Sequence, residues 1–135
     1  MTRITHPFVV DRELVIVEAV VVGKNGRTTD VRLVVDTGSS ATTLTPKVMS
    51  RVGYSRRDAY KDATVTTAIG EERGYWIHVA ELDVLGVATP DFPITVFALG
   101  HRDIDGLVGM NFLRNFNFEV RPAERLIHLD LLKQQ

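Results

Sequence analysis

The sequence contains no cysteine among its 135 residues. Disulfide bonds and thiolate metal sites are therefore excluded, while the redox environment of the protein is left open. The 16 Lys and Arg residues nearly balance the 17 Asp and Glu residues, so the formal net charge is −1 at pH 7. A chain with so little net charge, and with its basic residues scattered, gives no reason to expect nucleic acid or an acidic membrane surface as a partner.

Long apolar runs are missing as well. Runs such as Ala19–Val22 are far shorter than the roughly 20 apolar residues that cross a bilayer as a helix. The first residues, 1–7, lack the apolar segment of a signal peptide. We therefore expect a soluble, cytoplasmic protein with no membrane partner.

The composition is that of an ordinary globular domain. Hydrophobic residues make up 44% and charged residues 24% of a 135-residue chain, which is long enough to bury one sizeable core. No internal repeat, low-complexity segment or linker divides the sequence. We predict one domain over residues 14–131, preceded by an N-terminal segment at 1–13 and followed by a polar tail at 132–135.

Short β-favouring segments follow one another along the chain. Leu14–Val22 is dense in β-branched residues, and the Asn25-Gly26 pair after it is a strong signal for a tight hairpin, because both residues tolerate a positive φ. The return strand is expected at residues 27–35. Further strands are expected at residues 63–69, 75–84, 94–99, 104–109, 116–120 and 125–131.

Helical signals are few. Thr45 is a good N-cap and Gly53 suits a C-terminal stop, so a short helix is expected between them, and one or two helical turns are expected at 110–115. A polar tip at Gly70–Gly74 joins two expected strands into a long hairpin. Many short strands separated by turns predict an all-β barrel or sandwich.

One acidic residue lies where a strand is expected to end. The run 31–35, rich in β-favouring residues, leads directly into Asp36-Thr37-Gly38-Ser39-Ser40. A carboxylate at the end of a buried strand costs desolvation unless something uses or satisfies it, and glycine in the turn lets the backbone approach a ligand closely. An ordinary β-turn has the same composition, so the other candidates in the chain decide between the two interpretations.

Other chemistries find less support in the sequence. The histidines are far apart and form no metal-ligand pattern, so no metal site is expected. Asp103 and Asp105 match only part of a calcium loop, which leaves a metal-dependent hydrolase as a remote alternative. Ser39 and Ser40 do not lie in a Gly-x-Ser-x-Gly elbow. No phosphate-binding or dinucleotide-binding glycine loop is present, so no cofactor is expected.

A single carboxylate is a poor catalyst of amide hydrolysis, whereas a pair can act on one water. Two carboxylates about 3 Å apart cannot both ionise, so one holds a proton while the other serves as base. The sequence contains only one Asp-Thr-Gly motif. A symmetric homodimer would supply Asp36 twice across its two-fold axis.

With these features the sequence resembles the retropepsin-like aspartic proteases of the single-domain, bacterial type, over roughly residues 14–131. Three elements in order carry the resemblance: the hairpin leading into Asp36, the later hairpin with glycines at its tip, and the segment Asp105–Arg114. The resemblance implies a closed, pepsin-like barrel with one or two short helices and one lobe per chain.

The resemblance also implies roles for individual residues. Asp36 would be the catalytic acid of each protomer. The active loop would be supported by three residues after it, namely Thr37, Gly38 and Ser39, with the Ser39 hydroxyl bound to the Asp36 carboxylate. The hairpin would form a flap over bound peptide through Ile69, Gly70 and Glu71. The active loop would rest on a buttress of Leu107, Val108 and Gly109.

Two functions of different classes follow. The first is a homodimeric aspartic endopeptidase that cleaves an extended polypeptide with apolar residues around the scissile bond. The alternative is a catalytically weak or inactive module of the same fold that dimerises or binds peptides, suggested by the short flap with charged residues at 71–73. The termini do not indicate how a dimer is sealed: retroviral relatives interleave them in one sheet, and bacterial relatives need not.

Overall fold

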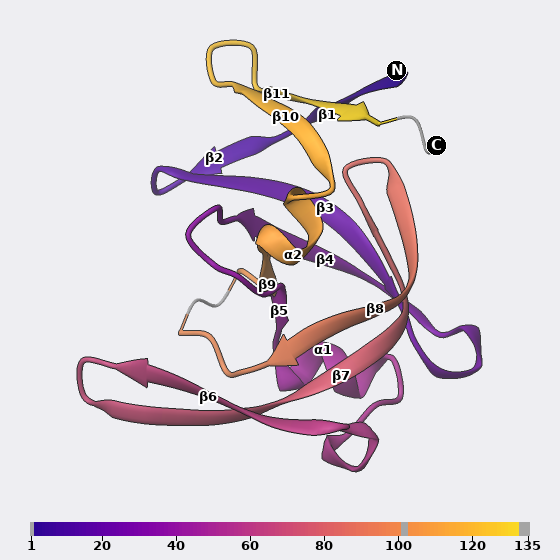
Figure 1. The fold of residues 1–135 in the computed structure, drawn as a ribbon, viewed down its shortest axis with the longest axis vertical. Coiled ribbons are helices and arrows are strands. Elements are labelled where there is room, and N and C mark those ends of the chain that lie inside the picture. The colour runs from indigo at the N-terminus through magenta and orange to yellow at the C-terminus, as the bar shows by residue number, and fades with distance from the viewer. Residues whose placement is uncertain (1, 101–102, 133–135) are drawn as a thin grey trace.

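A computed structural model describes residues 2–100 and 103–132, and it confirms the all-β class with one lobe in the chain (Figure 1). Two short α-helices and two 3-10 turns interrupt the strands. The elements are β1 (Thr2–Pro7), β2 (Val9–Asp11), β3 (Leu14–Val22), η1 (Lys24–Gly26), β4 (Thr28–Val35), β5 (Thr43–Leu44), α1 (Pro46–Arg51), η2 (Arg56–Asp58), β6 (Lys61–Thr67), β7 (Gly70–Val84), β8 (Val87–Val96), β9 (Gly106–Val108), α2 (Met110–Leu113), β10 (Phe116–Arg121) and β11 (Leu126–Leu131).

An eight-stranded sheet closes into a barrel through β3 and β7, with β2 and β6 attached outside the closed ring. Its strand order is β2-β3-β4-β9-β5-β8-β7-β6, and β3 pairs a second time with β7, from Ala19 opposite Val84 to Val22 opposite Glu81. Alternate residues of the strands point inward, so that Val21 of β3 and Leu33 of β4 are fully buried. This closure confirms the predicted barrel. Aliphatic and aromatic side chains fill the interior of the barrel.

A smaller sheet joins the two ends of the described chain. Its order is β1-β11-β10, with β1 antiparallel to β11 from Thr2 opposite Leu131 to Pro7 opposite Leu126. Arg3 donates to Asp130 at 2.8 Å, and this hydrogen bond lowers the pKa of the Asp130 carboxyl. Strands thus occupy most of the segment predicted to precede the domain, although the domain boundary at residue 14 itself stays a prediction. Most of the predicted polar tail, 133–135, lies outside the described residues.

The hairpin of β6 and β7 turns earlier than the sequence indicates. The turn lies at Ala68 and Ile69, and β7 runs without interruption from Gly70, so the predicted tip at 70–74 is wrong. Gly70 is the first residue after the turn and has a φ of 134°, which glycine adopts without strain. Gly74 is a packing glycine inside the strand, because a Cβ there would lie 2.1 Å from the Val96 carbonyl oxygen.

Strand β8 also differs from its predicted range of 94–99. It begins at Val87 and ends at Val96, with Pro90 and Pro93 inside it. Only Thr95 and Val96 of β8 pair with β5, so the earlier part of the strand has β7 on one side and no second partner among the described residues. Proline lacks an N–H to donate, and a strand tolerates it where one edge is open.

The helices form close to where the sequence predicts them. The Thr45 hydroxyl accepts from the Val48 N–H at 3.4 Å and caps α1, and Gly53 follows the helix with a φ of 86°. The second helix, α2, is shorter than the predicted range of 110–115. In the part of the chain that the structure describes, neither helix has the length and apolar character needed to cross a membrane.

We expect Gly74→Ala to destabilise the protein by about 1–3 kcal/mol, the range typical of overpacking. The added methyl group would meet the backbone oxygen of Val96 and the Phe97 ring. Denaturant unfolding measures the change. Gly100→Ala is the matched control, because nothing lies within 4 Å of a Cβ at that position. Equal stability of the two variants would show that β7 is not packed in this way.

Candidate active site

The turn that carries Asp36 begins at the end of β4 and lies on the same side of the molecule as the tip of the β6–β7 hairpin (left in Figure 1). The Asp36 N–H donates to the Val108 carbonyl at 2.9 Å, and the Ser39 N–H donates to the Asp36 carbonyl at 3.3 Å. The Gly38 N–H donates to the Asp36 carboxylate at 2.9 Å. Backbone groups thus hold both the main chain and the side chain of Asp36.

The Ser39 hydroxyl does not make the contact that the resemblance implies. It donates to the Ala41 carbonyl at 2.8 Å and so closes the turn on itself. A hydroxyl has one proton to donate, and here that proton is used within the turn. Thr37 and Gly38 are exposed on the protomer surface, where a second protein surface could reach them.

Strand β9 lies directly beneath this turn. It runs parallel to β4, with Val34 opposite Leu107 and Val35 opposite Val108, so the pairing ends where Asp36 begins. Gly109 follows in a space that only glycine fits, because a Cβ would lie 2.2 Å from the Ala41 carbonyl oxygen. The structure therefore brings the predicted active loop and the predicted buttress together.

The start of α2 binds the active loop from below. The Met110 N–H donates to the Ser39 carbonyl at 2.8 Å, and the Asn111 N–H donates to the Ser40 carbonyl at 3.1 Å. These two carbonyls lie in an irregular turn with no strand partner, so the helix supplies hydrogen bonds that the turn cannot make for itself.

A buried side-chain network, absent from the sequence-based prediction, completes the support. The Thr42 hydroxyl is buried; it accepts from the Gly109 N–H at 3.1 Å and donates to the Asn111 amide oxygen at 2.7 Å. The Asn111 amide nitrogen donates in turn to the Pro93 carbonyl at 2.9 Å. The only sequence signal was a threonine between an active turn and a short strand, which does not identify a partner 69 residues away.

Asp105, weighed above as a metal ligand, has a structural role instead. Its carboxylate accepts from the Arg32 N–H at 2.9 Å and lies 3.8 Å from the Arg51 guanidinium. Its own N–H donates to the Arg32 carbonyl at 2.9 Å. Within residues 2–100 and 103–132, no three His, Asp or Glu side chains gather as a metal site would require.

The predicted flap residues lie at the tip of the β6–β7 hairpin. Ile69 is 98% exposed, and Gly70 and Glu71 are exposed beside it. No hydrogen bond joins residues 68–73 to residues 36–41 among those described. At the hairpin base the Arg56 guanidinium lies 5.4 Å from the Tyr75 ring, and burial raises the pKa of the Tyr75 hydroxyl. The hairpin is thus anchored at its base and extends freely at its tip.

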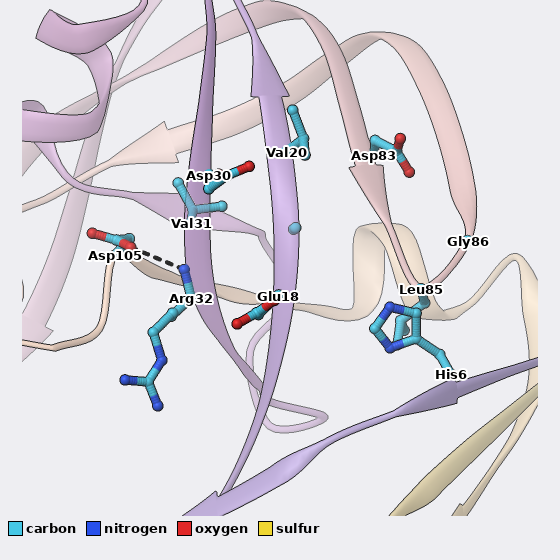
Figure 2. Close-up of a pocket in the computed structure, with 11 residues that line it drawn as sticks. His6, Glu18, Val20, Asp30, Val31, Arg32, Asp83, Leu85, Gly86 and Asp105 are labelled. Carbon is cyan, nitrogen blue, oxygen red and sulfur yellow. Dashed lines mark hydrogen bonds between the residues drawn. The ribbon is translucent and has the colours of Figure 1, made fainter.

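A cavity of about 530 Å³ lies elsewhere, on the outer face of β3 and β4 (Figure 2). Glu18 and Asp30 line it from these strands, Asp83 lines it from β7, and His6 comes from β1. The dashed line in Figure 2 is the Arg32–Asp105 hydrogen bond described above. None of the predicted site residues lines this cavity, so it is separate from the Asp36 turn.

Comparison with known proteins identifies the class. Residues 20–115 match the family model described as "gag-polyprotein putative aspartyl protease", and the chain belongs to this family. This range includes the Asp36 turn, the hairpin and β9.

A solved structure agrees with the family. The fold is similar to that in the crystal structure of a retropepsin-like aspartic protease from Rickettsia conorii, with a TM-score of 0.69 and 25% sequence identity over 96% of this chain and 91% of that one. No curated protein matches the sequence. The protein is therefore a retropepsin-like aspartic protease by family and fold, as the resemblance predicted.

We expect Thr42→Val to destabilise the protein by about 1–3 kcal/mol, because the isosteric change leaves the buried Gly109 N–H without an acceptor. Thr42→Ser keeps the hydroxyl, and its free energy of unfolding should fall distinctly less than that of Thr42→Val. Denaturant unfolding of the two variants gives the comparison. A valine variant as stable as the serine variant would show that the hydroxyl does not hold the loop.

Proposed function

We propose that the protein is an aspartic endopeptidase whose active site is shared by two identical chains, each supplying Asp36. The observation that carries this proposal is the half-site itself: a carboxylate held by backbone donors on an exposed turn, in a family of aspartyl proteases. No other Asp or Glu side chain hydrogen-bonds to the turn among the described residues. A second copy of the chain supplies the missing acid.

The two Asp36 carboxyls then act on one water molecule. Because two carboxylates at hydrogen-bonding distance share one proton, one is ionised and takes a proton from the water. The resulting hydroxide adds to the scissile carbonyl carbon, and the protonated partner gives its proton to the carbonyl oxygen. When the C–N bond breaks, the nitrogen takes the proton of the protonated carboxyl and leaves as the amine, while one hydroxyl of the tetrahedral intermediate gives its proton to the other carboxylate and the carbonyl re-forms as a carboxylic acid. The carboxyl pair is left with one proton, as at the start.

The substrate in this proposal is an extended polypeptide. An extended chain can pair with a strand edge through its main chain, while its side chains enter pockets on either side. The tip of the β6–β7 hairpin carries the apolar side chain of Ile69, which is 98% exposed, and this tip lies on the same side of the molecule as the turn that follows β4 (Figure 1). This arrangement favours apolar residues near the scissile bond.

A non-catalytic peptide-binding or dimerisation module is the competing function. The Ser39 hydroxyl is turned to Ala41 and so does not assist the Asp36 carboxylate. Such a module would keep the fold and the shared interface while cleaving nothing. The first of the following experiments separates the two functions.

We expect a scan of wild-type protein on denatured casein from about pH 3 to pH 8 to show cleavage where the carboxyl pair holds one proton, and a statine-type transition-state mimic to block this cleavage. Asp36→Asn should abolish it, because an amide cannot take the proton from water. Its circular dichroism and sedimentation should match the wild type. Undiminished cleavage by the variant would disprove the catalytic role of Asp36, and no cleavage by a dimeric wild type would favour the module.

The shared site also predicts a concentration dependence. Specific activity should rise with protein concentration near the dimer dissociation constant, because only the dimer contains a complete carboxyl pair. Dilution series of activity and analytical ultracentrifugation on the same samples provide the test. Activity that stays proportional to concentration in a sample shown to be monomeric would rule out a shared site.

A further inference from the structure

We propose that the cavity between the small sheet (β1, β11 and β10) and the outer face of the barrel binds a free basic amino acid, lysine or arginine. The ligand would be held by its carboxylate, its α-ammonium group and its charged side chain. This site is separate from the Asp36 turn, because none of residues 36–41 lines the cavity. The inference therefore does not depend on the proposed peptidase activity.

The cavity is enclosed by elements from both parts of the fold. Strands β3, β4 and β7 form one wall, and β1 of the small sheet contributes His6 from another side (Figure 2). A second cavity of about 390 Å³ shares His6, Glu18 and Arg32 with the first and extends it toward Val9 of β2. Ligand sites usually have volumes of about 300–1,000 Å³. The cavity of about 530 Å³ is therefore large enough for a small organic molecule.

The turn between β7 and β8 connects the two parts of the fold that enclose the cavity. The backbone φ is 54° at Leu85 and 79° at Gly86, as in a tight turn. Leu85 is fully buried, and a Cβ at Gly86 would lie only 2.8 Å from the Ile4 side chain of β1. Because the turn packs directly against the small sheet, the wall that it forms has a defined position.

Two carboxylates flank an apolar floor in the cavity. Val20 of β3 lies directly opposite Asp30 of β4 and also directly opposite Asp83 of β7. Directly opposite residues share a face of the sheet, with Cβ atoms about 4.5–5.5 Å apart. Figure 2 shows Asp30 and Asp83 on either side of Val20. Such a pair can accept hydrogen bonds from an ammonium or guanidinium group placed over the valine.

The neighbouring row of the sheet carries one charge of each sign. Glu18 of β3 lies directly opposite Arg32 of β4. A guanidinium group matches the geometry of a carboxylate, and a carboxylate accepts from an ammonium group. This row can therefore bind the α-carboxylate and the α-ammonium group of an amino acid side by side.

The distance between the two rows matches the length of a basic side chain. Glu18 and Val20 are two residues apart on β3, as are Asp30 and Arg32 on β4, and two residues of a strand span roughly 7 Å. Lysine and arginine carry their charges on stems of four or three methylene groups. A ligand with its Cα at the Glu18–Arg32 row therefore brings its charged end to the carboxylates beside Val20.

The charged side chains of both rows are available to a ligand. Four of them make no ion pair among residues 2–100 and 103–132, namely Glu18, Asp30, Arg32 and Asp83. The hydrogen bond drawn in Figure 2 uses the backbone N–H of Arg32 and leaves its guanidinium out. Asp105 also lines the cavity, but its carboxylate accepts that N–H and lies 3.8 Å from the Arg51 guanidinium.

The balance of charge selects a ligand that carries both signs. Three carboxylates and one guanidinium give the two rows an excess of negative charge, which favours a ligand with net positive charge. A simple amine would leave Arg32 without a partner, and a simple carboxylic acid would leave the three carboxylates without one. A free basic amino acid supplies one carboxylate and two cationic groups, so every group of the two rows finds a partner.

Titration of the full chain with L-lysine and with L-arginine, followed by ¹H–¹⁵N correlation spectra, tests the site. The Asp36→Asn variant is used, so that the outcome is independent of any peptidase activity. We expect saturable shifts of amide signals within 18–20, 30–32 and 83–86. Saturable shifts confined to residues 36–41 would place the ligand at the Asp36 turn and overturn the proposal, and so would the absence of saturable shifts.

Three analogues test the three charged groups of the ligand separately. Norleucine lacks the side-chain charge, cadaverine lacks the carboxylate, and Nα-acetyl-lysine lacks the α-ammonium group. We expect each to bind at least tenfold more weakly than lysine. An analogue that binds as tightly as lysine would show that the corresponding group is not recognised, and would overturn the assignment of a free basic amino acid.

Substitutions in the two rows test the roles of the protein side chains. Asp83→Asn should weaken the binding of both lysine and cadaverine severalfold. Arg32→Gln should weaken lysine binding but not cadaverine binding, because cadaverine has no carboxylate for the guanidinium. Glu72→Gln is the matched control, since it removes an exposed carboxylate of β7 outside the cavity and should leave both affinities unchanged.

Thermal unfolding of each variant checks that it folds. Unchanged lysine affinity in folded Asp83→Asn and Arg32→Gln would overturn the site. An equal loss in Glu72→Gln would do the same, because it would show that lysine responds only to the overall charge of the protein.

Discussion

The parallel pairing of β4 with β9 is the constraint on which the rest of this structure depends. It ends at Val35 and Val108, and the Asp36 N–H continues it by donating to the Val108 carbonyl at 2.9 Å. The turn beyond it stays compact because Gly109 admits the Ala41 carbonyl and because buried Thr42 satisfies the Gly109 N–H. The turn that carries the Asp36 carboxylate is therefore fixed at its start to a strand pair of the barrel.

The same pairing links the active loop to the small sheet. Helix α2 begins two residues after β9 ends, bonds to the loop carbonyls of Ser39 and Ser40, and leads into β10 within a few residues. Helix α2 therefore connects the Asp36 turn to the small sheet, whereas no hydrogen bond among the described residues joins the tip of the β6–β7 hairpin to that turn.

Local signals predicted much of the fold because they act over a few residues. Asn25 and Gly26 have φ values of 55° and 73°, as the hairpin required, and Thr45 caps α1. Errors arose where packing from distant residues decided the outcome. Position 74 requires glycine because the Val96 carbonyl oxygen leaves no room for a Cβ, and not because the chain turns there. Likewise β1 is a strand because β11, from the other end of the described chain, pairs with it from Thr2 opposite Leu131 to Pro7 opposite Leu126.

The sequence alone was sufficient to predict the class of protein and to place an aspartate at the end of β4, because both depend on residue type and order; the second copy of Asp36 stays a prediction. Only the tertiary structure decided what holds the acid in place. Thr42 and Asn111 are 69 residues apart and meet through folding. The Ser39 hydroxyl donates to the Ala41 carbonyl and not to the Asp36 carboxylate, because the path of the backbone in space decides which acceptor lies within reach.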